Sequence, residues 1–280
     1  MILVTGATGN VGGELVRALA DAGQPVRALV RAGREPGFPA GVQPVAGDLN
    51  QPESLRPALA GAQALFLYPG YQDMAGTLAE ARQAGVSRVV MLSGSSAASG
   101  DLSNAVSRYM IESEAAVRDS GLAWTMVRSF GFMSNTLQWV PQLRAGDVVR
   151  APFAGVQVAM IDPLDIAAVA AAALTAPGHD GRVYTVSGPQ ALGPADRARI
   201  LGEVLGRDLR FEAQPDDEAR AEMAAAMPAA YVDAFFDFYV KGTLDESQPQ
   251  PDVAEVTGRP PRTFRQWAQA HAGLFESDGA

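Results

Sequence analysis

The amino-acid sequence predicts an α/β fold: a doubly wound parallel sheet followed by a smaller, mixed C-terminal lid region. Apolar runs typical of buried strands alternate with amphipathic helical segments through residues 1–130, as in parallel strands joined by crossover helices. Glycine-rich or polar turns follow the strands, and the alternation gives way to shorter, mixed elements after residue 130. We therefore expect one sheet with helices on both faces and right-handed connections.

The chain begins with a strand, a glycine-rich turn and a helix. Residues 1–5 are expected as a buried parallel strand, and an amphipathic helix is expected over residues 13–22. Between them Gly6, Gly9 and Gly12 let the backbone bend tightly and approach a pyrophosphate, whose charge the helix N-terminus favours. This order of elements predicts a dinucleotide site of the Rossmann type, and a purely structural turn is the alternative.

The second strand, residues 25–30, indicates which dinucleotide binds. Proteins that prefer NADH usually end this strand with Asp or Glu, which accepts a hydrogen bond from the ribose. Here Arg31 follows the strand, with Arg27 and Arg34 close in sequence. A guanidinium suits the 2′-phosphate in charge and geometry, so the sequence favours NADPH over NADH. The alternative is that Arg31 only solvates a strand end.

The same alternation continues to residue 127. We expect strands over residues 42–46, 64–68, 88–92 and 123–127, and helices over residues 52–60, 73–84 and 104–120. Ligands of such sheets bind at the carboxyl ends of the strands. The residues just past these ends are therefore candidate site residues: Gly6, Arg31, Asp48, Tyr68, Pro69, Gly70, Ser93, Gly94, Ser129, Phe130 and Gly131. Asp48 is either an acceptor for the adenine amino group or only a charge at a helix N-terminus.

The second half of the chain is expected to cover the sheet edge. Residues 1–130 form the cofactor-binding core, and residues 131–280 form a substrate-binding lid that closes a pocket above the nicotinamide, with residues 155–187 returning to the core. The lid pieces are expected as helices over residues 132–143, 161–174, 194–205, 216–227, 228–240 and 263–274, strand-like segments around residues 152–159 and a strand over residues 182–187.

Composition excludes several classes of function. The chain has no cysteine, which rules out disulfides and thiol nucleophiles, and its net charge of −9 argues against a nucleic-acid partner. No charged and apolar leader and no apolar run near about 18 residues is present, so we expect a cytoplasmic protein without membrane contact. His179 and His271 lack neighbours at ligand spacing, so no metal site is expected.

Several motifs in order resemble the NmrA-like branch of the atypical short-chain dehydrogenases/reductases, including its NADPH:quinone oxidoreductase-type members. They are residues 4–12, 26–31, 47–49, 113–114, 120–128, 132–135, 161–167 and 262–267. The resemblance implies NADPH binding through the loop 6–12 and Arg31, with a substrate pocket near Phe132 and Asn135. The cofactor residues expected in full are Gly6, Thr8, Gly9, Asn10, Val11, Gly12, Arg31, Asp48, Leu49, Tyr68, Pro69 and Ser93.

The catalytic pattern departs from that of typical short-chain reductases. These enzymes use Tyr-x-x-x-Lys, in which the lysine lowers the pKa of the tyrosine and the tyrosine protonates the carbonyl oxygen. Here Tyr109 is followed four residues later by Ser113, and Lys241 is the only lysine of the chain. Members of the NmrA-like branch often carry Lys or His where this chain has Met110, which suits a core or pocket-lining position.

Two functions remain compatible with this pattern. In the first, the protein is a reductase that passes hydride from NADPH to a small apolar carbonyl, enone or quinone, with the proton from Tyr109, Ser93 or water. In the second, it is a non-catalytic NADP(H) redox sensor that acts through a protein partner. The enzyme is favoured because aromatic and Met side chains follow a strand end. The expected substrate residues are Tyr68, Met110, Phe130, Phe132, Met133 and Asn135.

Overall fold

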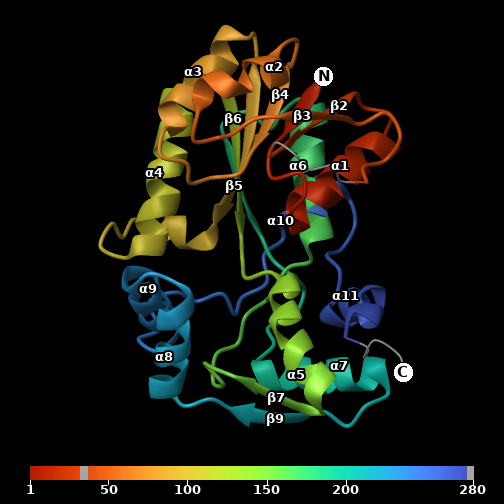
Figure 1. Ribbon diagram of the computed structural model, residues 1–280, viewed down its shortest axis with the longest axis vertical. Coiled ribbons are helices and arrows are strands. Elements are labelled where there is room, and N and C mark those ends of the chain that lie inside the picture. Colours follow the sequence, from red (N-terminus) through yellow and green to blue (C-terminus); the bar gives the residue numbers. More distant parts are fainter. Residues whose placement is uncertain (32–36, 276–280) are drawn as a thin grey trace.

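The computed structural model describes residues 1–31 and 37–275, and it has a sheet-bearing part above a smaller second part (Figure 1). The main sheet has seven strands in the order β3-β2-β1-β4-β5-β6-β8, and all of its pairings are parallel. Its strands are β1 Ile2–Val4, β2 Val26–Val30, β3 Gln43–Ala46, β4 Ala64–Leu67, β5 Arg88–Gly94, β6 Ala123–Ser129 and β8 Arg182–Val186. The predicted doubly wound parallel sheet is therefore confirmed.

Helices cover both faces of this sheet because its strands are apolar on both sides (Figure 1). On one face Ile2 and Val4 pack with residues of α1 (Asn10–Asp21), α6 (Pro163–Thr175) and α10 (Asp252–Thr257). Leu3 points the other way, as the period of two in a strand requires. That second face carries the 3₁₀ turn Pro52–Leu55 and the helices α2 (Arg56–Leu59), α3 (Met74–Gln83) and α4 (Ala105–Asp119).

The second part of the molecule has its own apolar core. Trp139, Trp267, Phe264 and Phe275 are fully buried there. The elements around them are the 3₁₀ helix Met133–Trp139, α5 (Val140–Ala145), the parallel pair β7 (Val148–Ala151) and β9 (Arg210–Ala213), α7 (Pro194–Leu205), and α11 (Phe264–Ala270) with the turn Ala272–Leu274. The helices α8 (Asp216–Ala226) and α9 (Ala229–Tyr239) lie beside this core (Figure 1).

Element boundaries differ from the sequence predictions in a few places. The first helix begins at Asn10 rather than at residue 13, because Gly12 and Gly13 take helical conformation within its first turn. β5 continues through Ser93 to Gly94, since its pairing with β6 extends that far. The short elements β9 and α10 were not predicted. They have four and six residues, which is too short to show a clear periodic pattern in the sequence.

No helix within the described residues is long and apolar enough to span a bilayer.

Candidate functional site

The turn after β1 is built for a close approach by its backbone. Gly6 has φ of 60°, and its carbonyl accepts the Gly9 amide at 2.9 Å. A Cβ added at Gly12 would lie 2.1 Å from the Gly6 oxygen, so only glycine fits where the helix meets the turn. Gly9 caps α1 without any side-chain hydrogen bond, which leaves the N-terminal amides available to an anion. This cradle fits a pyrophosphate.

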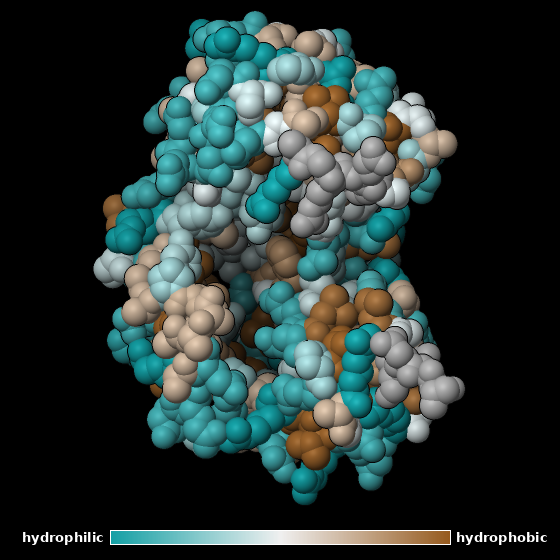
Figure 2. All heavy atoms as spheres, viewed as in Figure 1, coloured by the Kyte–Doolittle hydropathy of each residue, from teal (hydrophilic) through white to brown (hydrophobic). Residues whose placement is uncertain are grey.

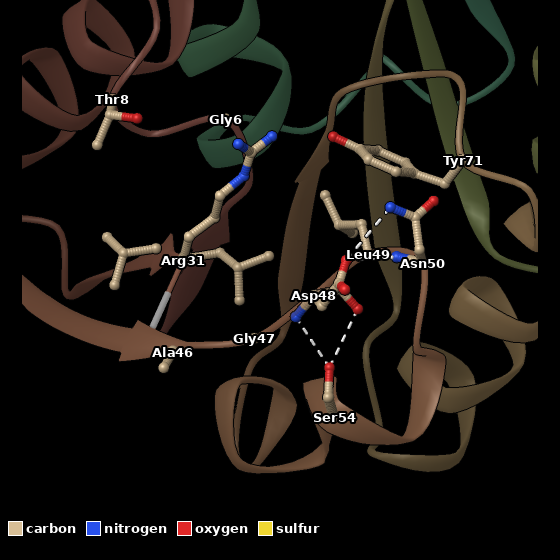
Figure 3. Close-up of a pocket in the computed structure, with 12 residues that line it drawn as sticks. Gly6, Thr8, Arg31, Ala46, Gly47, Asp48, Leu49, Asn50, Ser54 and Tyr71 are labelled. Carbon is tan, nitrogen blue, oxygen red and sulfur yellow. Dashed lines mark hydrogen bonds between the residues drawn. The ribbon is translucent and has the colours of Figure 1, made fainter. Parts of the chain in front are cut away.

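Three strand ends meet beside this turn and enclose a cavity of about 840 Å³ (Figure 3). β1 contributes the turn with Gly6 and Thr8, β2 contributes Arg31, and the loop after β3 contributes Asp48. They meet because parallel strands end at the same edge of a sheet. The full lining is Gly6, Thr8, Leu29, Val30, Arg31, Ala46, Gly47, Asp48, Leu49, Asn50, Ser54 and Tyr71. The cavity thus gathers sequence-predicted cofactor residues from three separate segments.

Arg31 brings a positive charge into this cavity. Its side chain extends from the end of β2 into the space between Gly6 and Tyr71 (Figure 3). Arg27 has a structural task instead, because its guanidinium donates to the carbonyl oxygens of Ala58 and Ala60 at 2.6 and 2.7 Å. Arg34 lies outside the described residues. A phosphate in this cavity would therefore meet the guanidinium of Arg31.

Asp48 shapes the floor of the cavity. Its carboxylate accepts the Asn50 amide at 2.9 Å, and its own amide donates to Ser54 Oγ at 2.9 Å (Figure 3). These bonds hold the loop in a turn, with Leu49 buried beneath it. Tyr71, which the sequence did not single out, closes the opposite side, and burial raises its pKa to about 12. Its only sequence signal was its place just past the fourth predicted strand.

Tyr109 reaches the loop after β4 from α4. Its hydroxyl donates to the Pro69 carbonyl at 2.8 Å. Gly70 has φ of 95°, and a Cβ there would fall 2.0 Å from the Tyr109 hydroxyl, so this tyrosine requires a glycine. Burial, and next the neighbouring phenol of Tyr68, raise the pKa of Tyr109. The phenol is therefore neutral at physiological pH, with its proton directed at a backbone oxygen.

Ser93 belongs to a buried charged cluster. Its hydroxyl donates to Glu114 at 2.7 Å, and Arg128 donates to both oxygens of the same carboxylate at 2.8 and 2.7 Å. Arg118 adds a further bond at 2.7 Å. Burial alone would raise the pKa of Glu114, but the bonds from Arg128, Ser93 and Arg118 outweigh it and hold this pKa below its usual value. The cluster joins α4 to β5 and β6.

The segment that follows β6 carries most of the expected substrate residues. Phe130 and Met133 are buried, Phe132 is half-buried, and Asn135 is exposed. The side chain of Met110 lies close to the end of β5: a Cβ added at Gly94 would be 3.6 Å from it. Asn10 at the start of α1 donates to Ser134 at 3.0 Å. This bond ties the beginning of the lid to the glycine turn, while the roles of the segment in substrate binding stay a prediction.

A buried carboxylate at the same sheet edge was not foreseen. Glu246 lies between α9 and α10, and its Oε1 accepts the hydroxyl of Ser95 at 2.5 Å. Its Oε2 accepts the Gly131 amide at 3.3 Å. Burial raises the pKa of Glu246 to about 7. In sequence this residue is one acid in a polar, proline-rich loop, so nothing local distinguished it from a solvated charge.

The sheet edge faces an open space. The surface is hollowed between the sheet-bearing part and the second part, and apolar atoms are visible within this hollow (Figure 2). The chain between α9 and α10 crosses the molecule at this level (Figure 1). The glycine turn, the strand ends and the lid thus surround one region.

Comparisons with known proteins identify the family. The family model described as NAD(P)H-binding matches residues 6–177. The chain is 45% identical over 280 residues to a (4-alkanoyl-5-oxo-2,5-dihydrofuran-3-yl)methyl phosphate reductase of Streptomyces griseus, covering 98% of this chain and 99% of that protein. It is 40% identical over 284 residues to an NAD(P)H azoreductase of Xenophilus azovorans, covering 98% and 99%.

A solved structure supports the same fold. The NADPH-dependent quinone oxidoreductase of Escherichia coli in complex with NADPH matches 99% of this chain, and this chain matches 100% of it, with a TM-score of 0.78 and 23% identity. The sequence relatives, the fold and the glycine turn all indicate a Rossmann-type NAD(P)H-binding protein. The chain therefore belongs to the NAD(P)H-binding family of Rossmann-fold proteins, as its resemblance to the NmrA-like short-chain dehydrogenases/reductases implied.

Proposed function

We propose that the protein is an NADPH-dependent oxidoreductase that reduces a small conjugated carbonyl compound, an enone or a quinone. The observation that carries the proposal is the cavity at the sheet edge, where the glycine turn and Arg31 offer a pyrophosphate cradle and a cation side by side. The relative of S. griseus supports an enone, because the name of its substrate describes a ring C=C bond next to carbonyl groups.

The chain's own residues would hold the cofactor in parts. The first-turn amides of α1 and the turn around Gly6 would take the pyrophosphate, with Gly12 leaving room for the backbone. Arg31 would pair with the 2′-phosphate, which is why we propose NADPH rather than NADH as the preferred form. Asp48 and Leu49 would border the adenosine, and Tyr68, Pro69 and Ser93 the nicotinamide end.

Bound NADPH would supply the hydride for the reduction. The protein's contribution is to place the acceptor carbon and to exclude water, for which the apolar segment from Phe130 to Met133 is suited. The sequence predicts Tyr109 and Ser93 as proton donors; in the structure their hydroxyls donate to the Pro69 carbonyl and to Glu114. The sensor hypothesis is less favoured, because the two relatives above are reductases over almost their whole length.

The test is NADPH oxidation at about 340 nm against quinones, enones and simple carbonyls, with NADPH and NADH binding measured by calorimetry. Turnover of a conjugated acceptor with tighter binding of NADPH than of NADH supports the proposal. Tight NADPH binding without turnover across the panel would favour the sensor instead. Equal affinity for the two cofactors would remove Arg31 as the selecting residue.

A further inference from the structure

Glu246 is held in one place at the carboxyl ends of β5 and β6. It is only 5% exposed, and its backbone oxygen accepts the Ala159 amide at 2.8 Å. Its side chain bonds to Ser95, directly after β5, and to the amide of Gly131, which follows β6. A carboxylate fixed between two neighbouring strand ends lies where substrates of such sheets are bound.

Among the residues that the structure describes, no cation pairs with the Glu246 carboxylate. None of the ion pairs in residues 1–31 and 37–275 includes it, and Ser95 and Gly131 are its hydrogen-bond donors there. The ionisable group that faces it is the phenol of Tyr239 on α9, whose pKa burial raises. Beyond Tyr239 lies Arg197 of α7, which is engaged with Thr136 at 3.3 Å and with the ring of Trp139 at 4.9 Å.

Burial without a cation favours the neutral carboxylic acid, and the bonds from Ser95 and Gly131 offset only part of this effect. The pKa of about 7 means that a large share of Glu246 is protonated at neutral pH. This is the range in which an acid donates most effectively in catalysis. In the protonated form the carboxylic acid donates to Ser95 Oγ, and the hydroxyl proton of Ser95 is then free for another acceptor.

The two donors expected from sequence are directed elsewhere. The Tyr109 hydroxyl donates to the Pro69 carbonyl, and the Ser93 hydroxyl donates to Glu114 inside a buried cluster. Ser95, in contrast, is bonded to a group that can itself supply a proton.

We propose that protonated Glu246 and Ser95 form the proton-donating pair of this enzyme. The inference rests on the reductase function proposed above. The substrate carbon gains a hydride, with its electron pair, from NADPH, and the carbonyl π electrons move to the oxygen. This oxygen takes the proton of Ser95 Oγ, Ser95 takes the proton of Glu246, and the resulting carboxylate regains a proton from water. With an enone the hydride enters at the β-carbon and the enol formed returns to the ketone.

The variants that test this pair are Glu246→Gln and Ser95→Ala, with Glu255→Gln as the matched control. Glutamine can still accept the Ser95 hydroxyl but carries no acidic proton. Glu255 is exposed on α10, so its replacement removes a charge outside the site. Each variant is assayed with 1,4-benzoquinone and 2-cyclohexenone, together with its NADPH affinity.

A readout independent of turnover is the infrared titration of carboxyl groups in the cofactor-free protein. We expect a protonated carboxyl band that titrates near pH 7 in the wild type and in Glu255→Gln and is missing in Glu246→Gln. The kcat of Glu246→Gln and of Ser95→Ala should fall about 100-fold or more at unchanged NADPH affinity, the contribution of a general acid. In the wild type, kcat should fall above about pH 7 as Glu246 loses its proton, and this pH dependence should be absent in Glu246→Gln.

The outcomes separate the two proposals. A wild type that turns over neither acceptor overturns the reductase function. An active wild type whose Glu246→Gln variant keeps the full rate, or whose carboxyl band persists in that variant, overturns the role of Glu246 alone. The role of Glu246 is likewise overturned if the kcat of Glu246→Gln falls by the same large factor at all pH values while the titrating band is unchanged. In that case Glu246 only holds the loop in place.

Discussion

The buried carboxylate of Glu246 should make the stability of the protein depend on pH. Its pKa is 4.5 in a model peptide and about 7 in the folded chain, a rise of roughly 2.5 units. At about 1.4 kcal/mol per unit, this corresponds to about 3 kcal/mol. The side chain is almost fully buried, so little of this energy is lost to screening by solvent.

The direction follows from proton binding in the two states. Below about pH 4.5 both states hold the proton, and Glu246 adds no pH dependence to the free energy of unfolding. As the pH rises toward 7, the unfolded chain releases its proton first, so the native state loses stability relative to it. Above about pH 7 both states are ionised and the full loss of about 3 kcal/mol is present.

Urea unfolding of wild type and Glu246→Gln, at several pH values from about 4.5 to 8.5, measures this effect. The free energy of unfolding of the wild type minus that of the variant should fall by about 3 kcal/mol across this range and then level off. Glu255→Gln corrects for the loss of one charge. A difference between wild type and Glu246→Gln that stays constant with pH would show that Glu246 ionises normally, and the reasoning would be refuted.

Three further predictions concern the cofactor and the tyrosine. Arg31→Glu should weaken NADPH binding by about 10- to 100-fold and NADH binding much less, because a charge-assisted bond to the 2′-phosphate is lost; calorimetry that finds equal losses would contradict this. Gly12→Ala should abolish binding of both cofactors, because its Cβ would strike the Gly6 oxygen, whereas Gly13→Ala, with its nearest such contact at 3.6 Å, should bind normally in the same titration. Tyr109→Phe should cost about 1 kcal/mol in urea unfolding by removing the bond to Pro69 and should change turnover of enones less than threefold; a loss near 100-fold would make Tyr109 the acid instead.

Local sequence was sufficient for the sheet and the cofactor cradle. Apolar runs of strand length alternating with helices specify a parallel sheet, because only helices on both faces can bury strands that are apolar on both sides. The first strand and the turn around Gly6 lie within a dozen residues, so the spacing of the glycines after the strand was enough to predict the turn. The position of Arg31 in the cavity was predictable for the same reason, because it follows the end of a strand, whereas its role toward the cofactor stays a prediction.

What only the tertiary structure decided is how polar groups from distant segments pair. Ser93 and Tyr109 had the right chemistry in sequence, but in the structure their hydroxyls donate to Glu114 and to the Pro69 carbonyl. Glu246 is separated from Ser95 by 151 positions, and its burial and raised pKa exist only because the loop after α9 folds back onto the sheet edge. Strand and turn patterns are fixed by neighbours along the chain, whereas the dielectric and the partners of a buried carboxylate are fixed by neighbours in space.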